Sequence, residues 1–270
     1  MMAQSTVTLQ DGAALAVSID GMGSDLTLFS GLDGSAAFWD PVVAQLAASF
    51  RVIRFDQRGI GASTRGTAAM TIDTLADDGH AVLAQVARPG TLLLGHSMGG
   101  LIVQAMALKD ERPIKGLVLS GTWARRNGAL SGMFGAGSDI FASASRDYMG
   151  LAAFLGHPSD WLKTNASMFQ GMFGDAMGMP AQQGVMSERM AAIMSFDRSS
   201  ELGGIRAPTL VQGAEDDMIV PAFMQRELAG LMPKCAATFM PGGGHFFPVT
   251  RPEAFVESIV TFAKTIGHIA

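Results

Sequence analysis

The chain is poor in charge and has no long apolar run. Charged residues make up 16% of its 270 residues, against roughly 25% in an average soluble chain, and 48% are apolar. Intrinsic disorder is excluded, because disordered chains combine high charge with few apolar residues. The longest apolar stretches, such as residues 151–155 and 190–194, are far shorter than the roughly 18 residues of a membrane-spanning helix. We therefore expect a folded domain with a substantial core and no membrane partner.

Basic residues and cysteine are also scarce. The net charge is −5 and the longest basic run is the pair Arg125 and Arg126, so we expect no nucleic-acid partner. No basic residue precedes Arg51, which argues against a secretory or transit signal. The single cysteine, Cys235, has no second cysteine to pair with and is interpreted as a structural or surface thiol. These features favour a cytoplasmic protein.

Eight short segments have the composition of β-strands, and several are apolar throughout, as strands buried on both faces are. They are residues 6–9, 14–19, 26–29, 51–55, 91–94, 114–119, 209–212 and 237–240. Turns join the first three, and strands then alternate with helical patterns. The pattern predicts an α/β fold with a mostly parallel, doubly wound, eight-stranded sheet and an antiparallel lead-in.

Two helices are marked by apolar residues at helical spacing. The first has the stripe Trp39, Val43, Leu46 and Phe50, and the second has Phe255, Ile259, Phe262 and Ile266. We expect Asp40 to cap the first helix, with Pro41 in its first turn. Thr250 and Glu253 have the spacing of a capping box for the second.

The alternation of strands and helices stops between residues 123 and 195. This segment is rich in Gly, Ser, Ala, Met and Phe, and shows helical fragments without a convincing strand. We therefore divide the chain into a core, residues 1–122 and 196–270, and a helical lid, residues 123–195, that is not independent. Most of its Met and Phe side chains should form helix core, and some should roof a site with a surface that adapts to varied apolar groups.

The segment Gly95-His96-Ser97-Met98-Gly99 follows a predicted strand and precedes an apolar helix that runs to about Lys109. A sharp strand-to-helix turn presents a serine above the sheet and needs glycine two positions before and after it. The Met98 amide, at the positive end of the helix, can stabilise an oxyanion. A glycine-rich turn is the alternative interpretation, and the flanking strand and helix favour a nucleophile.

A nucleophilic serine needs a histidine base, and the base needs a carboxylate. His245 lies in a glycine-rich loop between the last strand and the last helix, at the same edge of the sheet as Ser97. The acids Glu215, Asp216 and Asp217 follow another strand of that edge. Ser97, then Asp216 or Asp217, then His245 is the chain order of an α/β-hydrolase triad. Acids that only solvate the turn or cap a helix are the alternative. The other histidines, His80, His96, His157 and His268, are interpreted as structural or solvated.

These motifs resemble the α/β-hydrolase superfamily over nearly the whole chain. Besides residues 95–100, the segment 55–63 is similar to the family's D-x-R-G-x-G-x-S turn, and residues 208–221 and 244–253 are similar to its acid and histidine segments. Within the superfamily the chain looks most like small lidded serine hydrolases of the 3-oxoadipate enol-lactonase and aminoacrylate-hydrolase groups. The resemblance implies an eight-stranded α/β-hydrolase fold with a lid and a Ser-Asp-His triad.

The chain departs from this family at two places. Ser30-Gly31-Leu32 stands where the family has His-Gly, so the oxyanion hole is expected at the amides of Leu32 and Met98. The family's spacing selects Asp216 when counted from Gly213 and Asp217 when counted from Pro221. We select Asp216, because strand geometry fixes the upstream side.

The sequence thus predicts a serine hydrolase that cleaves a small ester, lactone or related acyl compound through an acyl-enzyme, without metal or cofactor. Ser97 attacks, His245 carries the proton and Asp216 orients His245. The alternatives are a carbon-carbon bond hydrolase or acyltransferase with the same triad, and a ligand sensor. Arg125 and Arg126 either bind a substrate carboxylate or lie on the surface at a domain junction.

Overall fold

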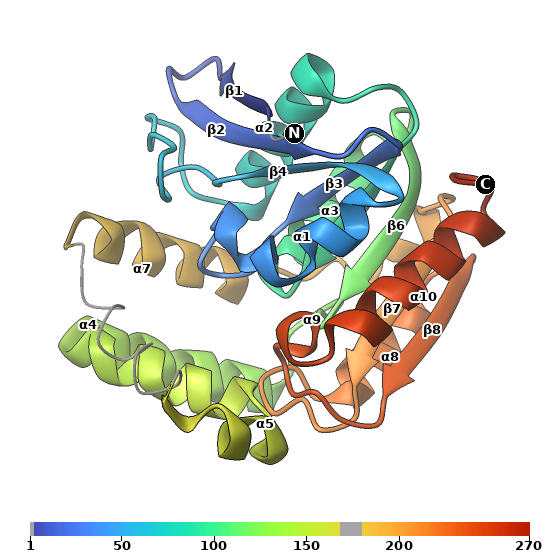
Figure 1. Ribbon diagram of the computed structural model, residues 1–270. Coiled ribbons are helices and arrows are strands. Elements are labelled where there is room, and N and C mark those ends of the chain that lie inside the picture. Colours follow the sequence, from blue (N-terminus) through green and yellow to red (C-terminus); the bar gives the residue numbers. More distant parts are fainter. Residues whose placement is uncertain (1–2, 168–179) are drawn as a thin grey trace.

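The computed structural model describes residues 3–167 and 180–270 and contains one eight-stranded sheet (Figure 1). Its strands are β1 (Ala3–Thr8), β2 (Ala14–Asp20), β3 (Ser24–Phe29), β4 (Phe50–Phe55), β5 (Thr91–His96), β6 (Ile114–Ser120), β7 (Thr209–Ala214) and β8 (Cys235–Met240). Their order is β1-β2-β4-β3-β5-β6-β7-β8. β2 pairs antiparallel with β1 and β4, and the other pairs are parallel. The predicted fold class is confirmed.

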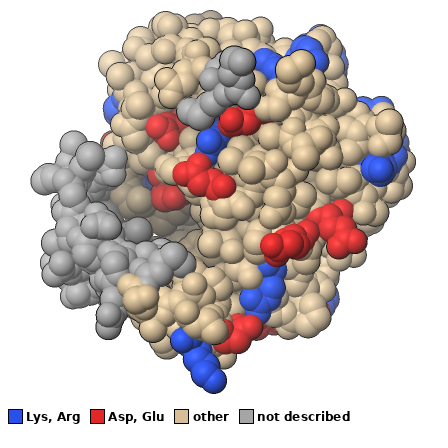
Figure 2. Space-filling model, in the orientation of Figure 1, with Lys and Arg blue, Asp and Glu red and all other residues tan. Residues whose placement is uncertain are grey.

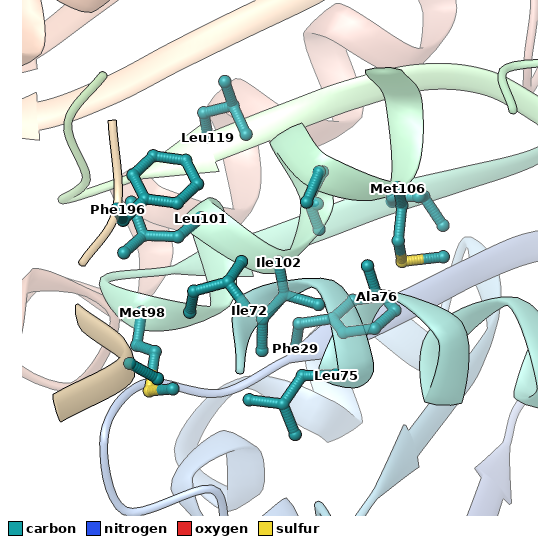
Figure 3. Packing of buried hydrophobic residues seen from close by; sticks show 14 of the residues in the cluster. Phe29, Ile72, Leu75, Ala76, Met98, Leu101, Ile102, Met106, Leu119 and Phe196 are labelled. Atoms are coloured by element: carbon teal, nitrogen blue, oxygen red, sulfur yellow. The ribbon is translucent and has the colours of Figure 1, made fainter. Parts of the chain in front are cut away.

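Helices cover both faces of the sheet because the central strands bury side chains on both. Leu93 packs in the cluster that contains α2 (Ile72–Val86), α3 (Met98–Lys109) and α8 (Ala222–Gly230), whereas Leu92 and Leu94 pack in the opposite cluster with α1 (Asp40–Ala47) and α10 (Pro252–Thr265). Figure 3 shows α2 and α3 interlocking over Phe29 through Leu75, Ile102 and their neighbours. Two hydrophobic cores thus pack on the opposite faces of the sheet.

Two details of the predicted helix starts are wrong. Asp40 is the first residue of α1 and Trp39 is its N-cap. Val42 joins the predicted stripe, Val43 packs half-buried against the same core, and Phe50 begins β4 rather than ending the helix. Thr250 does not cap α10, because its hydroxyl donates to the Gly243 carbonyl at 2.6 Å and ends the short helix α9 (Phe247–Thr250). Thr250 therefore holds the loop that carries His245.

Between β6 and β7 the chain forms α4 (Gly128–Gly156), α5 (Ser159–Thr164) and α7 (Pro180–Met194). Figure 1 shows these helices beside the ends of β6 and β7. We call residues 123–195 the helical insertion. Part of its Met- and Phe-rich sequence, residues 168–179, lies outside the described residues. Within the described ranges, no helix combines the length and apolar character needed to cross a membrane.

Candidate active site

Ser97 occupies a strained turn between β5 and α3. Its φ of 54° and ψ of −121° make it the one non-glycine residue with positive φ in the described part of the chain. A Cβ on Gly95 would lie 2.3 Å from the Gly99 carbonyl oxygen, and one on Gly99 would lie 2.0 Å from that of Phe29. Both glycines are therefore required by close backbone approach. Such strain persists only where the surrounding packing imposes it, and it marks Ser97 as a functional residue.

His245 pairs with Asp217 rather than with Asp216. The distance from His245 Nδ1 to Asp217 Oδ2 is 2.9 Å, and the two residues are 2% and 3% exposed. Asp216 instead accepts hydrogen bonds from the amides of Gly243 at 3.2 Å and Gly244 at 2.8 Å. The selection of Asp216 as the partner of His245 is thus wrong. β7 continues to Ala214, and a turn closed by the Asp217 amide on the Ala214 carbonyl directs Asp217 inward.

Hydrogen bonds to both oxygens hold the Asp217 carboxylate in place. Its Oδ1 accepts from the amides of Ile219 at 2.9 Å and Val220 at 2.8 Å, while Oδ2 also accepts from Gln225 Nε2 at 3.2 Å. An acceptor held in this way defines the tautomer and orientation of the His245 ring.

His96, inside the elbow, is unsuited to act as a base. It is 1% exposed, and its Nδ1 lies 3.0 Å from the Ser120 hydroxyl oxygen. Burial, with His245 at 4.9 Å between ring centroids, lowers the pKa of His96 well below its ordinary value. His96 is therefore a neutral structural residue, as the sequence predicted.

The loop after β3 passes directly beside Ser97. A Cβ on Gly31 would lie 3.3 Å from Ser97 Cβ and 3.8 Å from its Oγ. In the described residues, no protein group accepts a hydrogen bond from the Leu32 amide or from the Met98 amide at the first position of α3. Both amides are thus available to a ligand.

A cavity of about 420 Å³ opens above Ser97. The core contributes Gly31, Leu32, Asp33, Phe38, His96, Ser97, Ile219, His245, Phe246 and Val249, and the helical insertion contributes Phe134, Tyr148, Ala152, Ala153, His157, Trp161 and Met186. The cavity therefore brings together Ser97, His245 and Leu32, whereas Asp217 lies behind His245. Its walls are mainly apolar, and the predicted Met and Phe roof includes Phe134 and Met186.

Asp33 is the one formally charged side chain among the described cavity residues. The Asp33 side chain is solvent-accessible in the cavity, and desolvation by the surrounding walls raises its pKa to about 6, although the positive charge of Arg189 opposes the shift. Arg125 pairs with Glu227 at 2.6 Å, and neither Arg125 nor Arg126 borders the cavity. The surface interpretation of these two arginines therefore holds. On the face shown in Figure 2, basic and acidic side chains are interspersed.

Two polar residues near the site were not assigned a role from the sequence. Gln57 and Arg189 are 2% and 0% exposed, and both bind the loop that carries Leu32. Gln57 lies within the family-like turn at residues 55–63, and that motif could have identified it as a residue near the site. Arg189 lies in α7 without a recognisable motif.

The fold and this site define a class of protein. The sequence model of the Alpha/beta hydrolase family matches residues 28–258, and the chain belongs to that family. A hydrolase from Pseudomonas aeruginosa PA01 is similar in structure, with a TM-score of 0.82 and 25% identity over 96% of this chain and 97% of that one. An enol-lactonase from Burkholderia xenovorans LB400, at 22% identity, shares the fold with a TM-score of 0.83 over 96% and 100% of the two chains.

Among individual proteins, the chain is similar to one named "Putative carbamate hydrolase RutD" from Variovorax paradoxus (strain S110). The two are 34% identical over 248 residues, or 91% of this chain and 93% of the relative. A protein of the same name from Caulobacter sp. (strain K31) is 32% identical over 243 residues, or 87% and 88% of the two chains. The protein is accordingly a hydrolase of this family.

Proposed function

We propose that the protein is a serine hydrolase that cleaves a small ester, lactone or related acyl compound through an acyl-enzyme. The observation that carries the proposal is the strained Ser97 in one cavity with His245, whose imidazole Nδ1 is hydrogen-bonded to Asp217. His245 takes the Ser97 proton as Oγ attacks the carbonyl carbon, and then gives that proton to the leaving group. Water activated by His245 releases the acid and regenerates Ser97.

The amides of Leu32 and Met98 are the proposed oxyanion hole. They flank Ser97 from two separate elements, the loop after β3 and the first turn of α3. Neither N–H group has an acceptor among the described residues, and the Met98 amide also lies at the positive end of the helix dipole. Donors held ready in this way stabilise the charge that develops on the carbonyl oxygen.

The cavity lining indicates the charge of the substrate. Its one formally charged side chain, Asp33, is acidic, and no arginine or lysine is among its described residues. A substrate carboxylate would therefore lie near a like charge, which is unfavourable in a partly desolvated site. Arg189, whose positive charge acts on Asp33, is not a lining residue and donates to the carbonyls of the loop instead. We propose neutral or cationic acyl compounds as substrates. The name of the Variovorax relative adds carbamates to the compounds worth testing.

Covalent labelling tests this mechanism. A fluorophosphonate should label the wild-type protein on Ser97 and leave the Ser97→Ala variant unlabelled, and a chromogenic ester should give a burst of leaving group as the acyl-enzyme accumulates. Partition of the acyl group between water and added alcohols separates a hydrolase from an acyltransferase. Absence of an adduct on Ser97 in the folded protein would exclude the proposal, and single-turnover kinetics would favour a ligand sensor.

We further propose that the protein meets its substrate in the cytoplasm, because a single cysteine without an internal disulfide partner fits a reducing compartment. The single cysteine, Cys235, is half-buried and unpaired, and burial raises the pKa of its thiol to about 11. It remains protonated at neutral pH and plays no part in the proposed mechanism.

A further inference from the structure

A buried arginine from the helical insertion reaches the loop that carries the proposed oxyanion donor. Arg189 in α7 is 0% exposed. Its Nε donates to the Leu32 carbonyl at 2.7 Å, and its Nη2 donates to the Gly31 carbonyl at 2.9 Å and to Gln57 Oε1 at 2.8 Å. Burying a charge is costly unless it is well bonded, so these contacts must offset a large desolvation penalty.

Side chains hold this loop through three successive carbonyls. Gln57 Nε2 donates to the Ser30 carbonyl at 2.9 Å, and Arg189 donates to the carbonyls of Gly31 and Leu32. Gln57 also joins the two side chains through its Oε1. The Gly31 carbonyl also accepts from the Gly34 amide at 3.1 Å. A turn hydrogen bond and two side chains, one from the core and one from the insertion, therefore hold the backbone of the loop.

The geometry of the peptide unit links the hydrogen bond on the Gly31 carbonyl to the direction of the Leu32 N–H, the proposed oxyanion donor. The Gly31 carbonyl and the Leu32 N–H belong to one planar trans peptide unit, so they point in opposite directions. When Arg189 binds that carbonyl, the Leu32 N–H is directed away from Arg189. Gly31 lies against Ser97, so a rotation of this peptide unit would move the N–H relative to the reacting carbonyl.

The charge of Arg189 strengthens the same arrangement. Burial lowers its pKa to about 10, with Asp33 opposing the shift, so the guanidinium remains positive at neutral pH. A cation bound to a carbonyl polarises the peptide unit and makes its N–H a stronger donor. The Arg189 Nη1 is buried without a hydrogen-bond partner in the described residues. An arginine with one group unsatisfied is poorly explained by stability alone.

We propose that Arg189 is a positioning residue that sets the direction of the Leu32 amide and so couples the helical insertion to transition-state stabilisation. This inference rests on the proposed function. It gives α7 a role in the chemical step besides forming a wall, although Arg189 itself touches neither substrate nor Ser97.

The test compares Arg189→Met with Glu188→Gln. Methionine retains the length of the stem and removes every donor. Glu188 is the neighbouring residue of α7, is exposed and ties the same helix to the core through Arg65 at 2.7 Å, but does not contact the loop. With 4-nitrophenyl acetate, Arg189→Met should lower kcat about 10²-fold, in the range for loss of one oxyanion donor. KM should change less than about threefold, and Glu188→Gln should stay within about twofold in both constants.

Two inhibitors separate positioning from general loss of structure. Phenylboronic acid forms a tetrahedral adduct with serine, so its affinity should fall in parallel with kcat/KM in Arg189→Met. The ether 4-nitrophenetole has no carbonyl, and its affinity should not change. Equal loss of both affinities, or an unchanged kcat in the folded variant, would overturn the inference.

Arg189→Lys covers the case in which Arg189→Met does not fold. One ammonium group can reach one of the two carbonyls, so an intermediate kcat with an unchanged KM is expected, and a wild-type kcat would again overturn the inference. Ser97→Ala is measured alongside. If Ser97→Ala remains active, the proposed function fails, whereas an inactive Ser97→Ala beside a fully active Arg189→Met refutes only the role of Arg189.

Discussion

The core and the helical insertion contribute to one cavity in different ways. The core supplies Ser97, Asp217 and His245 from connections that follow β5, β7 and β8, and each of these residues is 8% exposed or less. The insertion supplies apolar and aromatic wall residues such as Trp161 and Met186, while Leu151 and Phe154 of α4 are largely exposed. The proposed catalytic residues therefore lie in the buried core, whereas the cavity walls come partly from the more exposed insertion. Substitutions in the core should mainly change kcat, and substitutions in the insertion should mainly change KM.

The largest effect should come from the core, at the nucleophile. Ser97→Ala should lower kcat on the order of 10⁶-fold, as in other triads, because the three residues act as a unit. Thermal unfolding should show a folded protein, since alanine adds no bulk to the elbow. Steady-state hydrolysis of 4-nitrophenyl acetate measures the loss, and near-normal turnover would contradict the assignment of chemistry to the core.

The two neighbouring aspartates sharpen the comparison within the core. Asp217→Asn should lower kcat about 10⁴-fold, because an amide at this position holds the wrong imidazole tautomer. Asp216→Asn keeps one oxygen, which can retain the shorter hydrogen bond from the Gly244 amide and loses the one from Gly243. Because Asp216 does not contact His245, the kcat of this variant should stay within about threefold. Rate measurements on both purified variants decide the matter, and the reverse ranking would return the role to Asp216.

Asp33 tests whether the core also selects the substrate. The pKa of Asp33 is raised to about 6, so the group is mostly neutral at pH 5 and mostly ionised at pH 7. The ratio of kcat/KM for a cationic ester to that for its neutral isostere should therefore rise about five- to tenfold between these pH values. The ratio cancels any pH dependence that the two esters share. In Asp33→Asn the ratio should be independent of pH, and a rise that persists there would assign it to another group.

The smallest effect should come from the insertion, at Trp161. Its ring stacks on His157 at 4.2 Å between centroids and borders the cavity. Trp161→Ala should raise KM for an aromatic ester about fivefold through lost apolar contact, with kcat within twofold. Methyl esters, which are too small to reach the wall, are the control substrates. A change in kcat larger than the change in KM would break the division of roles between the two regions.

Local signals predicted the elements and the elbow. Gly95 and Gly99 lie two residues before and after Ser97, and the clashes that require them arise within the same turn or with the neighbouring strand. The choice between Asp216 and Asp217 depended on the turn after β7, which the Asp217 amide closes on the Ala214 carbonyl, and the spacing of the sequence did not show this turn. A one-residue difference in register reverses the direction of a side chain.

The contact between Arg189 and the loop after β3 could not be predicted from the sequence. Its partners Gly31 and Leu32 lie more than 150 residues away in sequence. Neither apolar periodicity nor spacing encodes a contact between a helix of the insertion and a loop of the core. Such a bond follows from tertiary packing and is visible only in the folded structure.

The position of β8 has a consequence for how the protein loses activity. β8 is an edge strand that pairs with β7 alone and is partly exposed along its length, whereas β5 lies inside the sheet. Edge elements open more readily than central ones, and hydrogen exchange detects such local unfolding. Because His245 follows β8 and Ser97 follows β5, opening at this edge removes the proton acceptor and leaves the nucleophile in place. Mild denaturant should therefore abolish turnover before the central strands exchange, so that activity reports on the edge of the sheet and not on its centre.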